Sequence, residues 1–308
     1  MDFLYKILNT PSASGLEEQL AGFLKTELGE GHTDENGTFI YHKKGTGKSI
    51  IFAAAMDSPS LFVTHNGDGG FVRFCANGVD LKELKGLTVR FADNSGGVIY
   101  AEKDKEDAAD FFIDTFGKGA NEAENAVIQT PLVETEETLT AFDIGRAAII
   151  YSMVTAAKQL KDRDAYFVFI AKTIGNRHSA AFLEGLPHDA ELVFIDKSAA
   201  NDCPGERDVF ARLGGGVCLR AMDKSIISSK PLFDKAAHID NVKIQKEISQ
   251  RKHAGSILQK EFTGFSALSV GIPARYIDKI CETVSKTDID ELVKFILFYS
   301  NEERVISK

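Results

Sequence analysis

Polar side chains recur just beyond apolar runs that have the character of buried strands. Asp57 ends the run SIIFAAAMD, and Lys172 and Thr173 stand at the end of AYFVFIAKT. Asp196 closes ELVFID, and Asp278 closes the last apolar run, ALSVGIPARYID. In open α/β sheets, ligands bind at the carboxyl ends of the strands. The sequence therefore predicts a site at that edge of a sheet, lined by these five positions.

Other familiar catalytic patterns do not hold in this chain. HKKGTGKS, residues 42–49, is close to a phosphate loop, but His42 stands where the first glycine is required. An apolar run follows it, whereas a phosphate loop opens a helix, so a basic hairpin turn is the better interpretation. The seven histidines form no H-x-x-x-H or H-E-x-x-H pair, and no serine lies in a G-x-S-x-G elbow.

Composition narrows the class of protein. The 308 residues are 44% hydrophobic and 26% charged, which excludes a largely disordered chain. The net charge of −9 argues against nucleic acid and anionic membranes as partners. The sequence has no signal pattern, no membrane-spanning run and no cysteine spacing typical of a disulfide scaffold or zinc ribbon. We therefore predict a cytoplasmic protein.

Apolar periodicity predicts the helices that must support such a site. Residues 16–29, 142–161 and 288–301 each place their apolar side chains on one face of a helix. Gly29 closes the first of these helices. A shorter helix is predicted at 179–185, SAAFLEG, between two apolar strands.

The predicted strands fall into two groups. Continuous apolar runs at 49–57, 165–172 and 191–196 indicate buried strands, and the β-α-β order of the last two implies a parallel sheet. Residues 60–140 are richer in Gly, Asp and Asn, with short alternating segments that indicate small antiparallel strands. Within them, NEAENAV at 121–127 is predicted to be a short helix.

The fold class expected from this order is α/β. Residues 1–59 and 141–308 form a domain with a mixed, parallel-cored sheet flanked by helices. Residues 60–140 form a small β-rich domain inserted into it.

Seven segments, in order along nearly the whole chain, resemble the glutamyl and tetrahedral (TET) aminopeptidases. These are co-catalytic metallopeptidases with endoglucanase-M-like paralogues. The resemblance implies that residues 1–59 and 141–308 are the peptidase-type domain and that residues 60–140 are the inserted, dimerisation-type domain. FAAAMDSPSLFV is similar to their A-H-M-D strand, TAFDIGRAA to their A-L-D-D-R helix start, and FVFIAKTIGNRHSAA to their Q-E-E-V-G-x-R-G-A turn. The other four are NTPSASGLEEQLAGFL, FFIDTFGKGANEAENAV, ELVFID and VGIPARYIDKICE.

The resemblance implies two divalent metals, normally zinc or cobalt, bridged by an aspartate and served by a glutamate base. Carried over by position, the bridging aspartate is Asp143 and a further ligand is Asp196. The base and its neighbouring metal ligand are replaced by Lys172 and Thr173. The two histidine ligands are replaced as well, the first by Ala55 and the last by Asp278. Asp57, which orients the first histidine in the family, has nothing to orient.

These replacements predict the loss of catalysis. The catalytic glutamate and three metal ligands are missing, and a protonated Lys172 repels divalent ions and cannot act as a base. Lys172 is expected to form an ion pair with Asp143 or Asp196 instead, because buried carboxylates need a partner. The alternative is one hard ion, Mg²⁺, Mn²⁺ or Ca²⁺, held by Asp143, Asp196 and Asp278.

The function expected is therefore that of a degenerate, non-catalytic paralogue without a cofactor, which binds peptides or a partner subunit. The alternative is an active metal-dependent aminopeptidase or hydrolase with a site remodelled on the three aspartates. A third reading is a purely structural subunit of a mixed peptidase shell. Homo-oligomers, from dimers upward, or assembly with an active relative are expected, with an apolar patch left exposed on residues 60–140.

Overall fold

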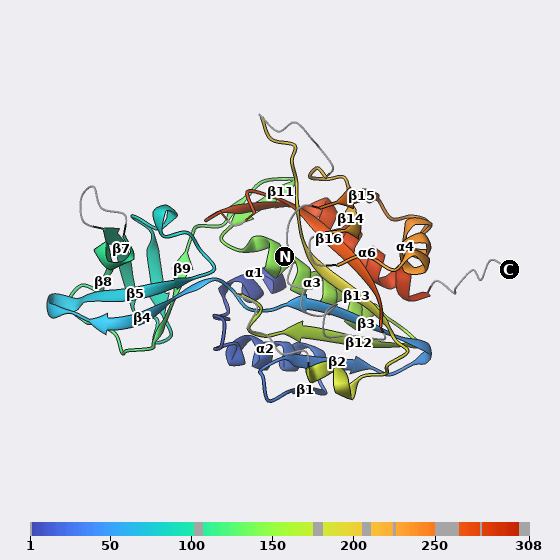
Figure 1. The fold of residues 1–308 in the computed structure, drawn as a ribbon, viewed down its shortest axis with the longest axis horizontal. Coiled ribbons are helices and arrows are strands. Elements are labelled where there is room, and N and C mark those ends of the chain that lie inside the picture. Colours follow the sequence, from blue (N-terminus) through green and yellow to red (C-terminus); the bar gives the residue numbers. More distant parts are fainter. Residues whose placement is uncertain are drawn as a thin grey trace.

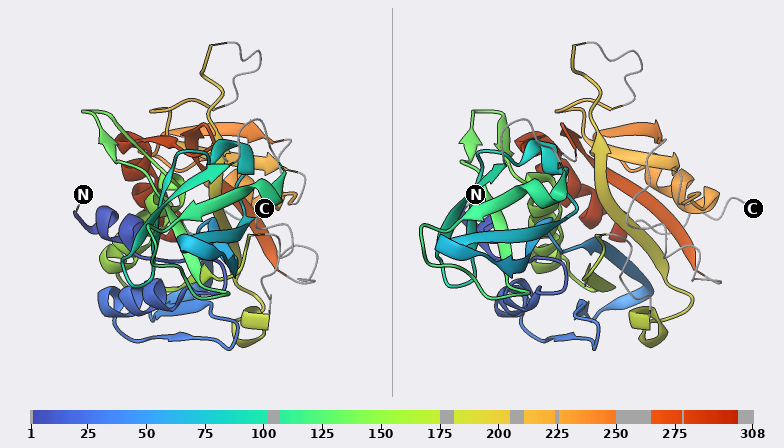
Figure 2. Two further views of the ribbon diagram at one scale, coloured as in Figure 1. Left: turned by 90° about the vertical axis from the view of Figure 1, so that its left-hand side faces the viewer. Right: turned by 60° about the vertical axis from the view of Figure 1, so that its left-hand side comes forward.

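The computed structural model describes residues 2–101, 107–174, 181–204, 211–223, 226–249, 265–277 and 279–301. Within these ranges, a large twisted sheet carries helices, and a small closed barrel stands to one side of it (Figure 1). The two further views show the barrel projecting from one end of the sheet domain (Figure 2). The α/β class with an inserted β-rich unit is thus confirmed.

The large sheet has eleven strands among the described residues. Nine lie in the order β1-β2-β12-β3-β13-β16-β17-β11-β10, and β14 and β15 branch from β16. Their bounds are β1 Gly31–Thr33, β2 Phe39–Lys43, β3 Thr46–Ala55, β10 Val133–Glu134, β11 Thr138–Ala141, β12 Arg163–Ile170, β13 Glu191–Ala199, β14 Val217–Met222, β15 Ile244–Ile248, β16 Ser266–Arg275 and β17 Glu282–Ser285.

The centre of this sheet is parallel, as predicted. β3 pairs in parallel with both β12 and β13, and β13 pairs in parallel with β16. The outer strands β2 and β17 run antiparallel to their neighbours. The central strands are buried on both faces, which is why their sequences are continuous apolar runs rather than alternating ones.

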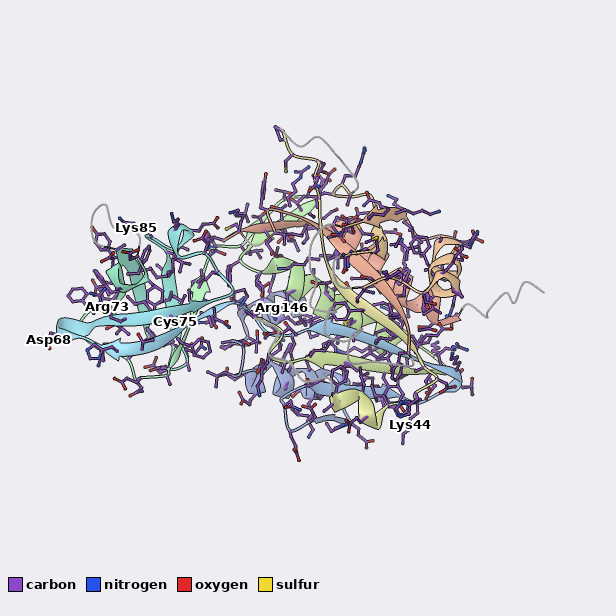
Figure 3. All side chains as sticks on the ribbon, viewed as in Figure 1. Lys44, Asp68, Arg73, Cys75, Lys85 and Arg146 are labelled. Atoms are coloured by element: carbon purple, nitrogen blue, oxygen red, sulfur yellow. The ribbon has the colours of Figure 1, made fainter. Side chains whose placement is uncertain are left out.

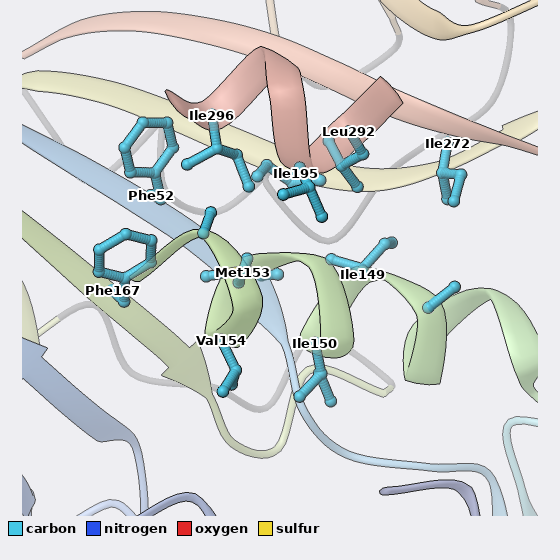
Figure 4. Packing of buried hydrophobic residues seen from close by; sticks show 14 of the residues in the cluster. Phe52, Ile149, Ile150, Met153, Val154, Phe167, Ile195, Ile272, Leu292 and Ile296 are labelled. Carbon is cyan, nitrogen blue, oxygen red and sulfur yellow. The ribbon is translucent and has the colours of Figure 1, made fainter. Parts of the chain in front are cut away.

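One face of the sheet is covered by long helices. α3 (Ile144–Gln159) and α6 (Lys286–Asn301) pack against each other and against the sheet. Figure 4 shows their side chains meeting Phe52, Phe167 and Ile195. The same apolar cluster takes in α1 (Asp2–Asn9), α2 (Glu18–Leu28) and α4 (Lys230–Ala237). None of the helices in the described ranges is long and apolar enough to span a membrane.

The barrel is closed by six antiparallel strands in the order β4-β5-β8-β7-β6-β9. Their bounds are β4 Ser60–Asn66, β5 Phe71–Asn77, β6 Thr88–Phe91, β7 Gly96–Ala101, β8 Phe111–Asp114 and β9 Asn125–Gln129. It has an apolar core of its own, which also includes Phe142 from the chain segment that leads into α3. Phe142 also donates its backbone N–H to Thr130 Oγ1 at 2.8 Å. The barrel therefore helps to fix the residue before Asp143.

Several local predictions are corrected by the fold. The segment 121–127 is not helical, because β9 begins at Asn125 to pair with β4 and β6, and Ala123 adopts a positive φ of 64° before it. Residues 42–49 do not form a hairpin, since β12 lies between β2 and β3. Of 179–185, the described part is a 3₁₀ turn at Ala181–Gly185.

Candidate functional site

The ends of β3 and β12 lie beside each other, and they bring Asp57 and Thr173 together. Asp57 is buried, and it accepts hydrogen bonds from Thr173 Oγ1 at 2.5 Å and from the backbone N–H of Ile174 at 2.9 Å. Both carboxylate oxygens of Asp57 are thereby engaged. Ala55, two residues earlier, offers no ligand atom. Asp57 and Thr173 thus lie close together, as predicted for strand-end residues. Their hydrogen bonds to each other and to Ile174 occupy the carboxylate of Asp57.

Lys172 is held by its backbone rather than by its side chain. It adopts a left-handed φ of 57°, and its N–H donates to Glu17 Oε1 at 2.8 Å. Glu17 is itself buried, and burial raises the pKa of its carboxyl group. The expected ion pair from Lys172 to Asp143 or Asp196 is wrong, because within the described residues the Lys172 ammonium forms no salt bridge.

Asp143 lies at the N-terminus of α3 in a left-handed backbone conformation. Its φ of 52° and ψ of 30° fall in the left-handed region, which Asp adopts more readily than most non-glycine residues. Its Oδ2 accepts from Arg146 Nε at 2.5 Å, one turn further along the helix. Arg146 also donates from Nη1 to the carbonyl of Met56 at 3.2 Å. Arg146 lies where the barrel meets the sheet domain (Figure 3).

The second partner of Asp143 is a residue that the sequence analysis did not single out. Lys197 on β13 places its Nζ 2.6 Å from Glu282 Oε1 and 3.5 Å from Asp143 Oδ1. Glu282 begins β17, is buried, and accepts the backbone N–H of Gly145 on Oε2 at 3.2 Å. Asp143, Arg146, Lys197 and Glu282 thus form a buried cluster of two acids and two bases, here called the Lys197 cluster.

Asp196 and Lys197 lie on opposite faces of the sheet, because successive side chains of a strand alternate. Val193 and Ile195 pack into the cluster that contains α3, so Lys197 faces that helix. Leu192 and Phe194 pack on the other face, where the side chain of Asp196 belongs. Asp196 Oδ1 accepts the backbone N–H of Lys197 at 2.7 Å. Asp278, the third predicted carboxylate, lies outside the described residues.

Electrostatics hold the Lys197 ammonium in its charged form. Burial alone would lower its pKa, but the nearby carboxylates of Glu282, Asp143 and Asp196 outweigh that effect and raise the pKa above its ordinary value. Burial raises the pKa of Glu282, and the Lys197 ammonium opposes that rise. The cluster therefore contains a permanent cation next to the carboxylate at the family's bridging position.

The residues at the predicted site do not fit the two-metal centre that the resemblance implies. Both oxygens of Asp143 face cations of the protein, Arg146 on one side and Lys197 on the other. Thr173 donates its hydroxyl to Asp57 instead of offering a carboxylate. Across the described ranges, no group of three or more His, Cys, Asp or Glu side chains is arranged to hold a metal ion.

A signal for Lys197 was present in the sequence. β13 extends from Glu191 to Ala199, so Lys197 is inside the strand and not in a loop after it. Strand alternation then places Lys197 on the side of Val193 and Ile195, where a charged residue needs a buried counter-charge. Glu282 gave no comparable signal, because only tertiary pairing of β16 with β17 brings it there.

An α/β sheet domain with an inserted six-stranded barrel is the fold that this chain shares with several solved aminopeptidases. The family model for M42 glutamyl aminopeptidases matches residues 37–295. The chain therefore belongs to the M42 glutamyl aminopeptidase family.

Relatives and solved structures agree with this assignment. A protein of Acetivibrio thermocellus named for aminopeptidase activity is 28% identical over 321 residues, covering 96% of this chain and 97% of that protein. The aminopeptidase APDkam598 from the archaeon Desulfurococcus kamchatkensis superposes with a TM-score of 0.89 at 22% identity, covering 100% of this chain and 98% of that one. The TET1 peptidase of Pyrococcus horikoshii, described as assembling into a tetrahedron or a large octahedral shell, gives 0.86 at 24% identity, with 97% and 98% covered.

Proposed function

We propose that this chain is a non-catalytic member of the M42 family, which binds peptides or a partner subunit without cleaving a peptide bond. The observation that carries the proposal is that the carboxylates of Asp143 and Asp57 are already paired with other groups of the protein. Asp143 is paired with Arg146 and Lys197, and Asp57 is hydrogen-bonded to Thr173. A co-catalytic peptidase needs free carboxylates to hold its ions and a base to take a proton from water.

The residue at the base position supports the same proposal. Lys172 carries an amine where the family resemblance places a carboxylate base, so the group that takes a proton from the nucleophilic water is missing at this position. It is also fixed in a left-handed conformation by its hydrogen bond to Glu17, which leaves little freedom to reposition the segment. An ammonium at this point suits recognition of an anionic group on a ligand better than hydrolysis.

The test is an aminopeptidase assay on the purified chain with Zn²⁺, Co²⁺ or Mn²⁺ added, using a panel of aminoacyl p-nitroanilides and short peptides. An active M42 peptidase assayed alongside provides the positive control. We expect no turnover by this chain above the buffer blank. Metal-dependent release of amino acids at rates typical of enzymes, about 1 per second or more, would contradict the proposal and favour the active alternative.

Self-association is part of the proposal, and the barrel offers a surface for it. Phe71, Phe112 and Tyr100 come from three neighbouring barrel strands, with ring centroids 5.1 and 5.6 Å apart along the series. Phe71 and Tyr100 are 45% and 49% exposed, and Phe116 nearby is 70% exposed. Aromatic side chains are enriched at protein interfaces, and exposed groups of them mark interaction sites.

Light scattering of the eluting protein measures the oligomeric state. We expect a dimer or a larger assembly for the unmodified chain and smaller species for the double variant Phe71→Ser/Tyr100→Ser. Phe298→Ser is the matched control, because Phe298 is 40% exposed on α6 in the sheet domain. An unmodified chain that elutes as a monomer, or equal loss of assembly in both variants, would argue against the barrel surface.

A cytoplasmic location completes the proposal. All four cysteines of the sequence are free thiols, which is usual in a reducing compartment. Fractionation of cells that express the native chain checks this part directly.

A further inference from the structure

The Lys197 cluster is built around its ammonium group. Nζ lies 2.6 Å from Glu282 Oε1 and 3.5 Å from Asp143 Oδ1, and Asp196 adds attraction from the next position of the strand. Lys197 is held from opposite directions by the start of α3 and the start of β17. Two carboxylates that converge on one cation from separate elements have the arrangement that a hard metal ion also requires.

The backbone makes room for this lysine. A Cβ added to Gly145 would lie 2.6 Å from Cδ of Lys197, 2.9 Å from its Cγ and 3.0 Å from Glu282 Oε2. The aliphatic part of Lys197 therefore passes over the first turn of α3 at a point where only glycine fits. Such close packing, together with the buried charges at both ends, fixes the ammonium in one place.

The burial of the two carboxylates favours a cation between them. Asp143 and Glu282 are 5% and 2% exposed, and the Lys197 ammonium lies within 4 Å of both. A buried carboxylate needs a cation or hydrogen-bond donors to stabilise its charge. Removal of the ammonium therefore leaves negative charge in the space that it occupied, and this charge attracts another cation.

We propose that Lys197 is the resident cation of this site, and that its ammonium prevents a divalent ion from binding between Asp143 and Glu282. Removal of its ammonium is expected to turn the two carboxylates into a divalent-cation site. The inference concerns the same site as the proposed non-catalytic function and goes beyond it, because it names the group that excludes the metal.

The experiment is calorimetric titration of metal-stripped full-length chain with Mn²⁺, repeated with Ca²⁺. The unmodified chain and the variants Lys197→Ala and Lys197→Met are compared. We expect one ion per chain in Lys197→Ala, bound at least about tenfold more tightly than any ion in the unmodified chain. Lys197→Met keeps most of the side-chain volume, so it is the second variant if the alanine variant does not fold.

Two controls separate this site from adventitious binding. Lys235→Met removes another buried lysine, whose Nζ lies 2.9 Å from Glu191 Oε2 beneath Tyr299, and should leave Mn²⁺ binding unchanged. The double variant Lys197→Ala/Glu282→Gln removes one of the two proposed ligands and should lose the gained ion. Unfolding curves for each variant report whether the fold is intact.

The inference is overturned if the folded lysine variants bind Mn²⁺ no more tightly than the unmodified chain, since Glu282 would then take up a proton instead. It is also overturned if the double variant retains the gained ion, or if the unmodified chain binds an ion that Glu282→Gln abolishes. Its failure is distinct from failure of the proposed function: peptidase activity without an ion at Asp143 would refute the latter alone.

Discussion

Two buried charge clusters lie on opposite faces of β13, at adjacent residues. Lys197 faces α3 and reaches Asp143 and Glu282, whereas Ser198 faces the other side and contacts Arg220. Arg220 is fully buried on β14, and the group around it, Arg220, Ser198, Ser269, Glu247 and Asp223, is here called the Arg220 cluster.

The two clusters satisfy their cations in different ways. Arg220 donates to the hydroxyls of Ser269 and Ser198 at 2.7 and 2.6 Å and to Glu247 Oε2 at 3.4 Å. Its planar fork is thus matched by several small neutral acceptors. Lys197 is a compact point charge whose nearest partners are carboxylates.

The difference indicates two purposes. A guanidinium with directional hydrogen bonds to strand side chains ties β13, β14 and β16 together, so the Arg220 cluster is a structural one. An ammonium between carboxylates is a compact charge with a hydrogen bond to Glu282, and a metal ion can supply such a charge as well. The comparison therefore separates a cluster that ties strands together, on one face of β13, from a cluster on the α3 face that depends on one compact charge.

Loss of Arg220 is expected to give the largest effect. Arg220→Met would remove the guanidinium that both Glu247 and Asp223 face, and it should cost about 3 to 5 kcal/mol of stability. Urea unfolding measures the change. Arg275→Met is the control, because the Arg275–Asp202 pair is partly exposed and should cost about 1 kcal/mol or less. Equal losses for the two variants would remove the structural role assigned to the Arg220 cluster.

A buried acid that is hydrogen-bonded to backbone amides, and that forms no salt bridge with any of the described residues, extends the comparison. Asp288 accepts the N–H groups of Gly214 and Gly216 at 2.8 and 2.7 Å, and burial raises its pKa to about 6. The folded chain then binds this proton more readily than the unfolded chain, whose value is near 3.8. The contribution of Asp288 to stability is fully present below about pH 4 and declines by about 3 kcal/mol as the pH rises to about 6.

The measurement for Asp288 is the unfolding free energy of the unmodified chain and of Asp288→Asn between pH 4.5 and 7.5. Asparagine cannot ionise. The free energy of unfolding of the unmodified chain should therefore fall relative to that of Asp288→Asn as the pH rises to about 6, and the difference between the two chains should then stay constant. Parallel curves across the range would mean that the amides alone keep the Asp288 pKa at its ordinary value.

The fit of Lys197 against α3 predicts a smaller loss. Gly145→Ala would press a methyl group against the Lys197 stem and Glu282, and it should cost about 1 to 3 kcal/mol despite the better helix propensity of alanine. Gly22→Ala on α2 is the matched control, since nothing lies within 4 Å of its added Cβ. That control should be neutral or stabilising by up to about 1 kcal/mol in thermal unfolding.

The smallest effect expected is on catalysis by Thr173→Glu. This change restores the carboxylate of one family ligand position, but Ala55 and Lys172 remain and Asp143 stays paired with Lys197. We expect no aminopeptidase activity with Zn²⁺, Co²⁺ or Mn²⁺ added. Measurable hydrolysis by this single variant would mean that the site is less altered than its contacts with Arg146 and Lys197 indicate.

Much of the fold could be predicted from apolar pattern. The strands predicted at 49–57, 165–172 and 191–196 are found as β3, β12 and β13. A strand that is buried on both faces consists of a continuous run of apolar residues, and such runs are easy to find in the sequence. The helix at 121–127 is wrong for the opposite reason: its residues have no strong pattern, and pairing of β9 with β4 and β6 decides its conformation.

The sequence alone determined the family and the α/β class. The resemblance predicted that Ala55, Lys172 and Thr173 replace a histidine and two glutamates of the family, and that Asp143 takes the bridging position. The strand ends predicted Asp57, Thr173 and Asp196 at one edge of the sheet. Only the tertiary structure decided which cations pair with the Asp143 carboxylate. Lys172 was the nearest candidate by position, but strand alternation and the start of β17 bring Lys197 and Glu282 to it instead. Charge pairing acts over a few ångströms in space, and a one-dimensional spacing cannot specify it.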